Sequence, residues 1–326
     1  MSDGGDTSVA RLLKQEAFIR ESVCPLVGHP AGSQGVELEE RRHGIVEYRF
    51  EGGQRVFAKP ILDSEEARGT YLIHRTFWEE GFGASSPYRV PEPLAYLPEQ
   101  GVLLIGGAPG ECLRELQAGD PSTWEEGLRR AARWLAALHS SPLRLGQADD
   151  PTEHCLHLAW RATQAAARRP ALEERIVRHL RELVARAVPA GAARTEVQTH
   201  GRFHAEHVFL TPEQVTVIDI DRASRGGPAK DVGEFLHRLR ADAARKRVDA
   251  DVVGRAEAAF LEEYKHASPA GLGGLQFSWS YSVLFSLCSR AARLDAKEAR
   301  TQELIDFYEA ELAAIPERLA AYGLMT

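Results

Sequence analysis

Hydrophobic and polar positions alternate in the first third of the chain in the manner of β-strands. Segments 44–52 and 54–62 each carry apolar side chains at alternating positions, and Gly52 and Gly53 separate the two segments. Successive side chains of a strand point to opposite faces of a sheet, so this pattern predicts an antiparallel hairpin. Lys59 is the one cation beside the apolar run of the second segment.

The spacing changes to that of helices in several longer segments. Residues 65–80 place Ala67, Leu72, Ile73 and Phe77 at intervals typical of one helical face. The same spacing predicts a helix at the N-terminus and further helices in the second half of the chain, over 8–23, 128–139, 157–169 and 172–188. Pro170 separates the last two of these. Three or four more helices are expected after Asp231.

Residues 197–236 form the most informative segment. Two short β-branched runs, 208–210 and 215–218, flank Thr-Pro-Glu-Gln, and the fixed φ of Pro212 suits a turn, so a hairpin is expected. The loop from Gly201 to His207 then projects from one end of this hairpin.

An acidic pair follows the second run of this hairpin. Asp219 and Asp221 are two residues apart, and on an extended chain both would lie on one face. Two carboxylates on one face repel each other unless a cation lies between them. A divalent metal ion or an arginine side chain would fill that role.

The motifs of this segment resemble those of a known enzyme family. They are His200-Gly201-x-Phe203-His204-x-x-x-Val208, Ile218-Asp219-x-Asp221 and Gly227-Pro228-Ala229-x-Asp231-Val232. Together they resemble the aminoglycoside phosphotransferase family, within the protein-kinase-like superfamily. The resemblance implies an α+β, bilobal protein-kinase-like fold. Residues 1–106 would form a small N-terminal lobe with an N-terminal helix, an antiparallel sheet and one helix. Residues 107–326 would form a mostly helical C-terminal lobe that carries the catalytic-loop hairpin.

The resemblance also assigns roles to individual residues. Lys59 looks like the strand lysine that contacts the phosphates of ATP, and Asp219 looks like the carboxylate that holds Mg²⁺, with Asp221 as a second metal residue. The helix over 65–80 would supply a glutamate that pairs with Lys59. Glu66 is the candidate, although counting back from Gly81 puts the family position nearer Thr70. We therefore expect the Lys59 ammonium and the Asp219 carboxylate to face each other across a cleft between the lobes.

Two loop residues depart from the family pattern H-G-D-x-x-x-x-N. Arg202 stands where the family has the aspartate that takes the proton of the acceptor hydroxyl, and His207 stands where it has asparagine. Arginine does not deprotonate near neutrality. At roughly 5 Å and an effective dielectric near 20, each like-charge unit costs about 3 kcal/mol, so Arg202 would compete with magnesium for Asp219. An imidazole nitrogen is also a poor substitute for an oxygen ligand of magnesium.

Other loop residues can take over the chemistry in an atypical enzyme. His204 or Glu206 would act as the base, Arg202 would contact phosphate as a cationic clamp, and His207 would remain beside the nucleotide. Structural roles are expected for His200, which would brace the loop through a ring N–H. They are also expected for Asp231, whose carboxylate would accept loop backbone N–H groups near a helix N-terminus, and for Trp124 and Trp134 in the core.

Three functions are compatible with these residues. The first is an atypical phosphotransferase that uses ATP and Mg²⁺ to phosphorylate a hydroxyl of a small molecule or a peptide. The second is a catalytically inactive, pseudokinase-type protein that binds a nucleotide, a peptide or a protein partner. The third is a hydrolase with a transition metal held by His204, His207, Asp219 and Asp221. The first is favoured because Lys59, Asp219 and Asp231 occur together.

Composition narrows the class of protein. The 326 residues, 44% of them hydrophobic, suffice for two lobes with cores, and the net charge of −7 argues against a nucleic-acid-binding surface. No apolar run reaches the length of a membrane span, and the first twenty residues lack the core of a signal peptide. The four cysteines show no CxxC spacing, which predicts buried thiols in a reducing cytoplasm.

Overall fold

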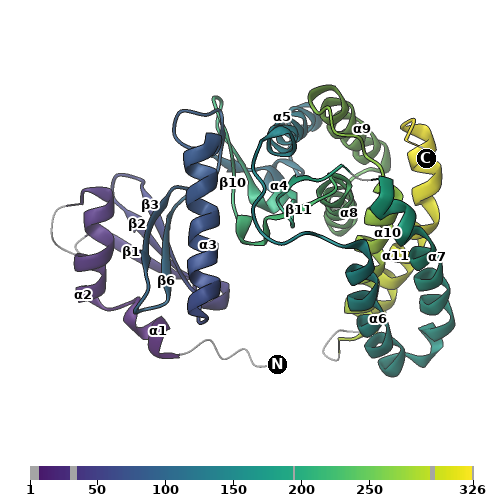
Figure 1. Ribbon diagram of the computed structural model, residues 1–326, viewed down its shortest axis with the longest axis horizontal. Coiled ribbons are helices and arrows are strands. Elements are labelled where there is room, and N and C mark those ends of the chain that lie inside the picture. Colours follow the sequence, from purple (N-terminus) through teal and green to yellow (C-terminus); the bar gives the residue numbers. More distant parts are fainter. Residues whose placement is uncertain (1–6, 30–34, 194, 294–297, 325–326) are drawn as a thin grey trace. The chain divides into compact units, whose positions relative to one another are not determined.

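The computed structural model describes residues 7–29, 35–193, 195–293 and 298–324 (Figure 1). The chain divides into two compact units. The first comprises Met1–Glu111 together with Phe209–Asp221, and the second comprises Cys112–Val208 together with Arg222–Thr326. The first unit thus contains the segment that carries Asp219 and Asp221. The mixed α+β architecture, with an antiparallel sheet in the first part of the chain and mostly helices in the remainder, confirms the predicted fold class.

A five-stranded antiparallel sheet forms the body of the first unit. Its order is β1-β2-β3-β6-β5, with β1 Val36–Glu40, β2 Val46–Phe50, β3 Arg55–Pro60, β6 Val102–Gly106 and β5 Pro93–Leu97. The β2–β3 hairpin confirms the prediction from alternation, and its turn contains Gly53 at a φ of 79°. Lys59 lies on β3, opposite Leu103 of β6.

One long helix packs against this sheet. Helix α3, Ser64–Phe77, begins at Asp63, whose side chain accepts a hydrogen bond from the Glu66 backbone N–H at 2.8 Å. The helix contacts β5 and β6 (Figure 1). Its buried side chains recur at helical intervals, namely Ala67, Thr70, His74 and Phe77. The helix predicted for residues 65–80 is therefore confirmed.

The N-terminal segment differs from the single helix predicted for residues 8–23. It consists of short pieces: α1 Thr7–Leu12, α2 Glu16–Phe18, a π-helical turn Ile19–Val23 and a 3₁₀ turn Cys24–Val27. The interruption has a tertiary cause, because the Tyr48 hydroxyl of β2 donates to the Leu13 carbonyl at 2.6 Å. The Leu13 carbonyl therefore accepts a hydrogen bond from a residue outside the N-terminal segment. Leu13, Phe18 and Val23 pack into the same apolar core as Tyr48.

A smaller sheet holds the predicted hairpin after the loop. Its order is β4-β10-β9-β7, with β4 Tyr88–Arg89, β10 Val215–Val217, β9 Val208–Leu210 and β7 Glu111–Cys112. The β9–β10 connection is a turn in which the Thr211 N–H donates to the Gln214 carbonyl at 3.1 Å. This confirms the predicted hairpin with Pro212 in its turn. The pairing of β10 with β4 is parallel.

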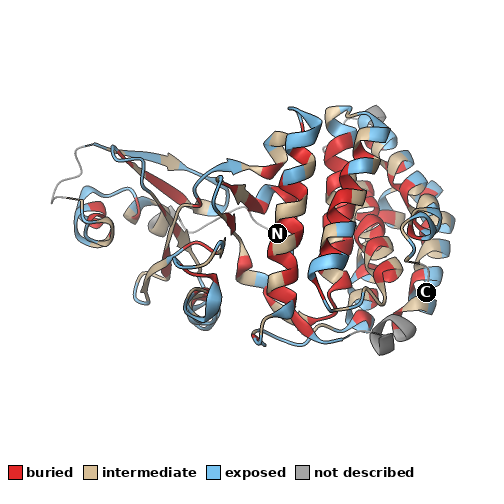
Figure 2. Ribbon diagram, turned by 90° about the horizontal axis from the view of Figure 1, so that it is seen from above, coloured by how far each residue is buried: buried red, intermediate tan, exposed pale blue. Residues whose placement is uncertain are grey.

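Eight helices, counted over the described residues, build the second unit. They are α4 Leu113–Leu116, α5 Pro121–Ser140, α6 Pro151–Arg168, α7 Glu173–Ala193, α8 Ala229–Lys246, α9 Ala250–Ala267, α10 Leu275–Ala291 and α11 Glu298–Ala321. Helix α5 packs on α9, α6 on α7, and α10 on α8 and α11, so that each helix has a buried face (Figure 2). Trp124 and Trp134 of α5 are fully buried, as predicted. A short 3₁₀ turn at Pro170–Leu172 separates α6 from α7.

Two features near the acidic pair differ from the sequence-based expectation. Strand β8, Val197–Thr199, pairs antiparallel with β11, Ser224–Gly226, a strand that the sequence analysis did not identify. Asp219 is not extended: its φ is 65°, and Ile220–Arg222 forms a 3₁₀ turn. The assumption of one strand face for Asp219 and Asp221 was therefore wrong. Among the described residues, no helix combines the length and apolar character needed to cross a bilayer.

Candidate active site

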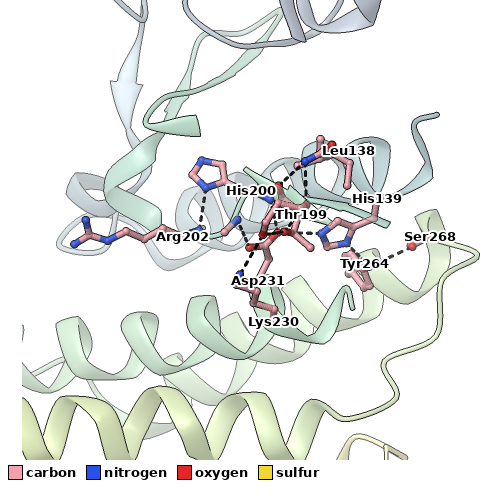
Figure 3. Close-up of polar contacts among 12 residues, drawn as sticks. Leu138, His139, Thr199, His200, Arg202, Lys230, Asp231, Tyr264 and Ser268 are labelled. Carbon is pink, nitrogen blue, oxygen red and sulfur yellow. Dashed lines mark hydrogen bonds and ion pairs between the residues drawn. The ribbon is translucent and has the colours of Figure 1, made fainter. Parts of the chain in front are cut away.

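A buried carboxylate holds the start of the loop in the second unit. Asp231, in the first turn of α8, is fully buried and accepts hydrogen bonds from the backbone N–H groups of His200 at 2.7 Å and Gly201 at 2.8 Å (Figure 3). This confirms the structural role predicted for Asp231. Burial alone would raise the pKa of this carboxyl group. The contacts with His139 and the loop outweigh burial and lower the pKa below its ordinary value.

The same carboxylate ends a chain of side-chain hydrogen bonds. His139 of α5 lies with Nε2 3.1 Å from Asp231 Oδ2 and Nδ1 2.6 Å from the Tyr264 hydroxyl. A carboxylate only accepts, so His139 donates from Nε2 and accepts the tyrosine proton at Nδ1. Ser268 in turn donates to the Tyr264 oxygen at 3.3 Å. The chain joins α5, α8 and α9 behind the loop (Figure 3).

The loop backbone needs glycine at one position. Gly201 has a φ of 83°, and a Cβ there would lie 2.0 Å from the Arg222 carbonyl oxygen. Next to it, His200 Nδ1 accepts from the Arg202 backbone N–H at 3.3 Å. The ring thus braces the loop as an acceptor in this contact, whereas the sequence analysis expected a ring N–H donor.

The predicted loop residues differ strongly in exposure. Arg202 is exposed, and its guanidinium extends away from Asp231 (Figure 3). Glu206 is also exposed and forms an ion pair with Arg114 of α4. His204 and His207 are buried, with ring centroids 3.7 Å apart. The His207 Nδ1–H donates to the Arg202 carbonyl at 3.1 Å.

His204 has the environment of a neutral imidazole. Burial, followed by the nearby His207 and Arg238, lowers the pKa of His204 well below its ordinary value. Its Nε2 has no hydrogen-bond partner within the described part of the chain. Beside it, Phe203 stacks between Trp134 at 5.8 Å and Phe235 at 5.2 Å, measured between ring centroids. The loop is therefore attached to the core by an aromatic stack as well as by Asp231.

The predicted phosphate and metal residues meet in the first unit. Lys59 Nζ lies 3.5 Å from Asp219 Oδ1 and forms an ion pair with Asp221 Oδ2. The Lys59 and Asp219 side chains keep 22% and 31% of their surface exposed. The expected proximity of Lys59 and Asp219 is thus present: both belong to the first unit, although the chain passes through residues 112–208 of the second unit between them.

Helix α3 reaches this cluster through a residue that the sequence analysis did not select. His74 is 1% exposed, and its Nε2 lies 2.8 Å from Asp221 Oδ1. Glu66, the candidate partner of Lys59, lies exposed in the first turn of α3. The sequence feature that could have identified His74 is its position on the apolar face of the helix, one turn after Thr70.

The acidic pair offers carboxylate oxygens, the type of ligand that Mg²⁺ prefers. Within the described ranges, no group of three or more His, Cys, Asp or Glu side chains is arranged to hold a metal ion. The hydrolase hypothesis therefore has no ligand cluster to support it. Magnesium in phosphoryl-transfer sites is bound by only one or two carboxylates together with substrate phosphates. The partly exposed Asp219 carboxylate fits that requirement.

The fold of the chain is similar to that of several solved structures. The choline kinase LicA from Streptococcus pneumoniae is 12% identical, with 91% of this chain and 98% of that chain covered and a TM-score of 0.56. An aminoglycoside phosphotransferase from Alicyclobacillus acidocaldarius is 16% identical, with 89% and 92% covered and a TM-score of 0.59. A choline/ethanolamine kinase family protein from Mesorhizobium loti is 16% identical, with 94% and 99% covered and a TM-score of 0.57.

These three likenesses show the kinase-like fold. No curated protein matches the chain in sequence. The model of the phosphotransferase enzyme family matches residues 64–275, which is more than half of the chain and includes α3, the loop and the acidic pair. The chain belongs to the phosphotransferase enzyme family.

Proposed function

We propose that this protein transfers the γ-phosphoryl group of ATP to a hydroxyl group of a small molecule. The proposal rests on one observation: the Lys59 ammonium and the Asp219 carboxylate lie 3.5 Å apart. In this pairing Lys59 would bind the phosphates of ATP, and Asp219 would hold Mg²⁺. When bound, the metal ion would neutralise charge on the phosphates. Phosphoryl transfer depends chiefly on such positioning and charge neutralisation, which a lysine and an aspartate supply.

Similar proteins support the choice of ATP and a small acceptor. One structure with a TM-score of 0.57 and 12% identity is the amicoumacin kinase hAmiN in complex with AMP-PNP, Ca²⁺ and Ami. The kinases and aminoglycoside phosphotransferase described above have names that likewise specify small acceptors. A peptide is the alternative class of acceptor.

The proton of the acceptor hydroxyl needs a base other than residue 202. Arg202 is exposed and permanently charged, so it serves as a phosphate clamp in this proposal. Glu206 is the better base, because its side chain is exposed, although its carboxylate forms an ion pair with Arg114. His204 has a free Nε2, but the atom is buried. General-base assistance is typically worth ~10²–10⁴-fold in rate, so a base that is held in an ion pair with Arg114 predicts slow turnover.

A catalytically inactive binding protein is the second candidate function. The specific observation in its favour is Arg202 in place of a carboxylate, since arginine cannot accept the proton. His207 also favours an inactive protein, because its Nδ1–H already donates to the Arg202 carbonyl. In this case the protein would bind a nucleotide at Lys59 without transferring phosphate.

We expect ATP with Mg²⁺ or Mn²⁺ to raise the melting temperature. Ligand at 100 times its Kd stabilises a protein by about 2.7 kcal/mol, which corresponds to several degrees for a chain of this size. Differential scanning fluorimetry with and without nucleotide measures this shift. Lys59→Met is the matched control, because it removes the ammonium but keeps the side-chain length. No shift at millimolar ATP in the parent protein would contradict both the enzyme and the nucleotide-binding candidates.

The variant Arg202→Asp should turn over ATP and acceptor faster than the parent protein. It places a carboxylate where the family has its base, and a positioned general base is typically worth ~10²–10⁴-fold in rate. Initial rates of phosphate transfer, measured across a panel of amino alcohols and aminoglycosides, give the comparison.

Arg202→Gln is the control for this variant, because it removes the positive charge without supplying a base. Equal rates for the aspartate and glutamine variants would show that residue 202 does not act on the acceptor proton.

A further inference from the structure

Asp221 is held from two sides within the first unit. Its Oδ2 pairs with the Lys59 ammonium and its Oδ1 lies 2.8 Å from His74 Nε2. A carboxylate oxygen only accepts, so His74 donates its Nε2 proton to Asp221. Both oxygens of Asp221 are therefore engaged by protein groups, and the plane of the carboxylate is fixed.

Asp219 is in a different situation. Its side chain is 31% exposed, against 20% for Asp221, and its contact with Lys59 is the longer of the two. The αL conformation of Asp219 and the 3₁₀ turn Ile220–Arg222 bring both carboxylates to the same ammonium group. Ile220, at the start of that turn, is fully buried, which anchors the turn in the core. The two carboxylates therefore present different surfaces to a ligand.

His74 is placed to transmit the position of a helix. It lies in the last turn of α3 and is almost completely buried, so its ring has little freedom to turn. Helix α3 packs on β5 and β6, and β6 is the neighbour of the strand that carries Lys59. The route from the helix to the ammonium group passes through two hydrogen-bonded or ion-paired contacts.

We propose that His74 is a positioning residue that acts through Asp221 to hold Lys59 beside Asp219. In this arrangement α3 contributes the imidazole of His74. The carboxylate that forms the ion pair with Lys59 comes from Asp221. Asp221 then serves as a brace, and Asp219, the more exposed of the pair, binds the metal ion. The consequence for nucleotide binding rests on the proposed function, whereas the brace itself can be tested without nucleotide.

The first experiment measures acylation of Lys59 by an acetyl N-hydroxysuccinimide ester, followed by mass spectrometry of the peptide that contains it. Only the free amine reacts, so an ion-paired lysine is labelled slowly. Asp221→Asn and His74→Leu should each raise the labelling rate at Lys59 by roughly threefold to tenfold, the effect expected for the loss of one hydrogen-bonded or ion-paired contact. His74→Gln keeps a donor near the Nε2 position and should stay within about twofold of the parent rate. Arg75→Ala, the exposed neighbour on the same helical turn, should leave the rate unchanged.

A double-mutant comparison separates positioning from a general structural role. If His74 acts through Asp221, the variant carrying both His74→Leu and Asp221→Asn should label no faster than Asp221→Asn alone. Additive increases would overturn the proposal, as would equal labelling of Lys59 in the parent and His74→Leu. Circular dichroism of each variant checks that the fold is retained. His74→Gln keeps the test decisive where His74→Leu is poorly folded, because labelling above the Asp221→Asn rate would also overturn it.

The second experiment measures binding of Mn²⁺–ATP by titration calorimetry. His74→Leu should weaken binding about tenfold, and His74→Gln should recover most of that loss. Asp219→Asn should abolish the dependence on Mn²⁺, whereas Asp221→Asn should retain it. Equal loss of Mn²⁺ dependence in both aspartate variants would overturn the assignment of Asp221 as a brace. If the parent protein binds no ATP, the proposed function fails, and the labelling result still decides the role of His74.

Discussion

Replacing Asp231 with alanine is expected to lower the free energy of unfolding of the second unit by about 3–5 kcal/mol. The change leaves the backbone N–H groups of His200 and Gly201 and the ring N–H of His139 without their common acceptor, and His200 and His139 are buried. Urea unfolding followed by tryptophan fluorescence measures the effect, since Trp124, Trp134 and Trp279 are all buried in this unit.

An aspartate at the start of another helix provides the control. Asp249 caps α9 by accepting from the Asp251 and Val252 backbone N–H groups, and its side chain lies at an exposed site. Asp249→Ala should cost about 1 kcal/mol, the usual value for a cap. A loss for Asp231→Ala no larger than this would show that the loop does not depend on the buried carboxylate.

The same carboxylate makes stability depend on pH in a defined direction. Its pKa in the folded protein is lowered, so its contribution is fully present above the ordinary pKa of an aspartate. The contribution is lost as the pH falls toward the lowered folded value. The parent protein should therefore lose more stability in acid than Asp231→Ala does.

Replacing Asp219 with asparagine is expected to reduce phosphate transfer from ATP by on the order of 10³-fold, which corresponds to about 4 kcal/mol of barrier. Asparagine keeps the shape of the side chain but removes the negative charge that would hold Mg²⁺ and face Lys59 at 3.5 Å. Rates of γ-phosphate transfer, measured with the acceptor panel used for Arg202→Asp, quantify the loss.

Asp63→Asn serves as the matched control, because this aspartate caps α3 in the same unit and is exposed. Its activity should stay within about twofold of the parent, since asparagine also caps helices well. Parent-like activity in Asp219→Asn would mean that any measured transfer does not use the acidic pair.

The sequence was most informative where local patterns and the fold agree. The alternation in β2 and β3, the helical spacing of α3 and α5, and the Pro212 turn between β9 and β10 all depend on residues close together in the chain, and each is confirmed. The prediction of a single N-terminal helix was wrong, and strand β11 was not predicted. Both differences arise from tertiary contacts. The Leu13 carbonyl, which directly follows α1, accepts a hydrogen bond from the Tyr48 hydroxyl of β2, and Ser224–Gly226 becomes a strand only because it pairs with β8.

In the candidate site, too, some residues could be selected from sequence motifs and others depend on tertiary contacts. Motif similarity selected Lys59 and Asp219, whose side chains lie 3.5 Å apart, although Lys59 and the neighbouring Asp221 are 162 residues apart in the sequence. His74 could not be found in this way, because its role comes from burial on α3 and from the turn that directs Asp221 toward it. A buried polar residue on an apolar helical stripe was the only trace of it in the sequence.

The loop is attached to the core at two places, and the residues that attach it are different from the exposed residue Arg202. Asp231 secures the backbone at His200 and Gly201, and Phe203 is clamped between Trp134 and Phe235, while Arg202 between them extends into solvent. The backbone at position 202 is thus held in place by its neighbours, whereas the side chain at this position makes no contribution to that attachment. The residue found there can be exchanged, in evolution or by design, without rebuilding the scaffold that presents it.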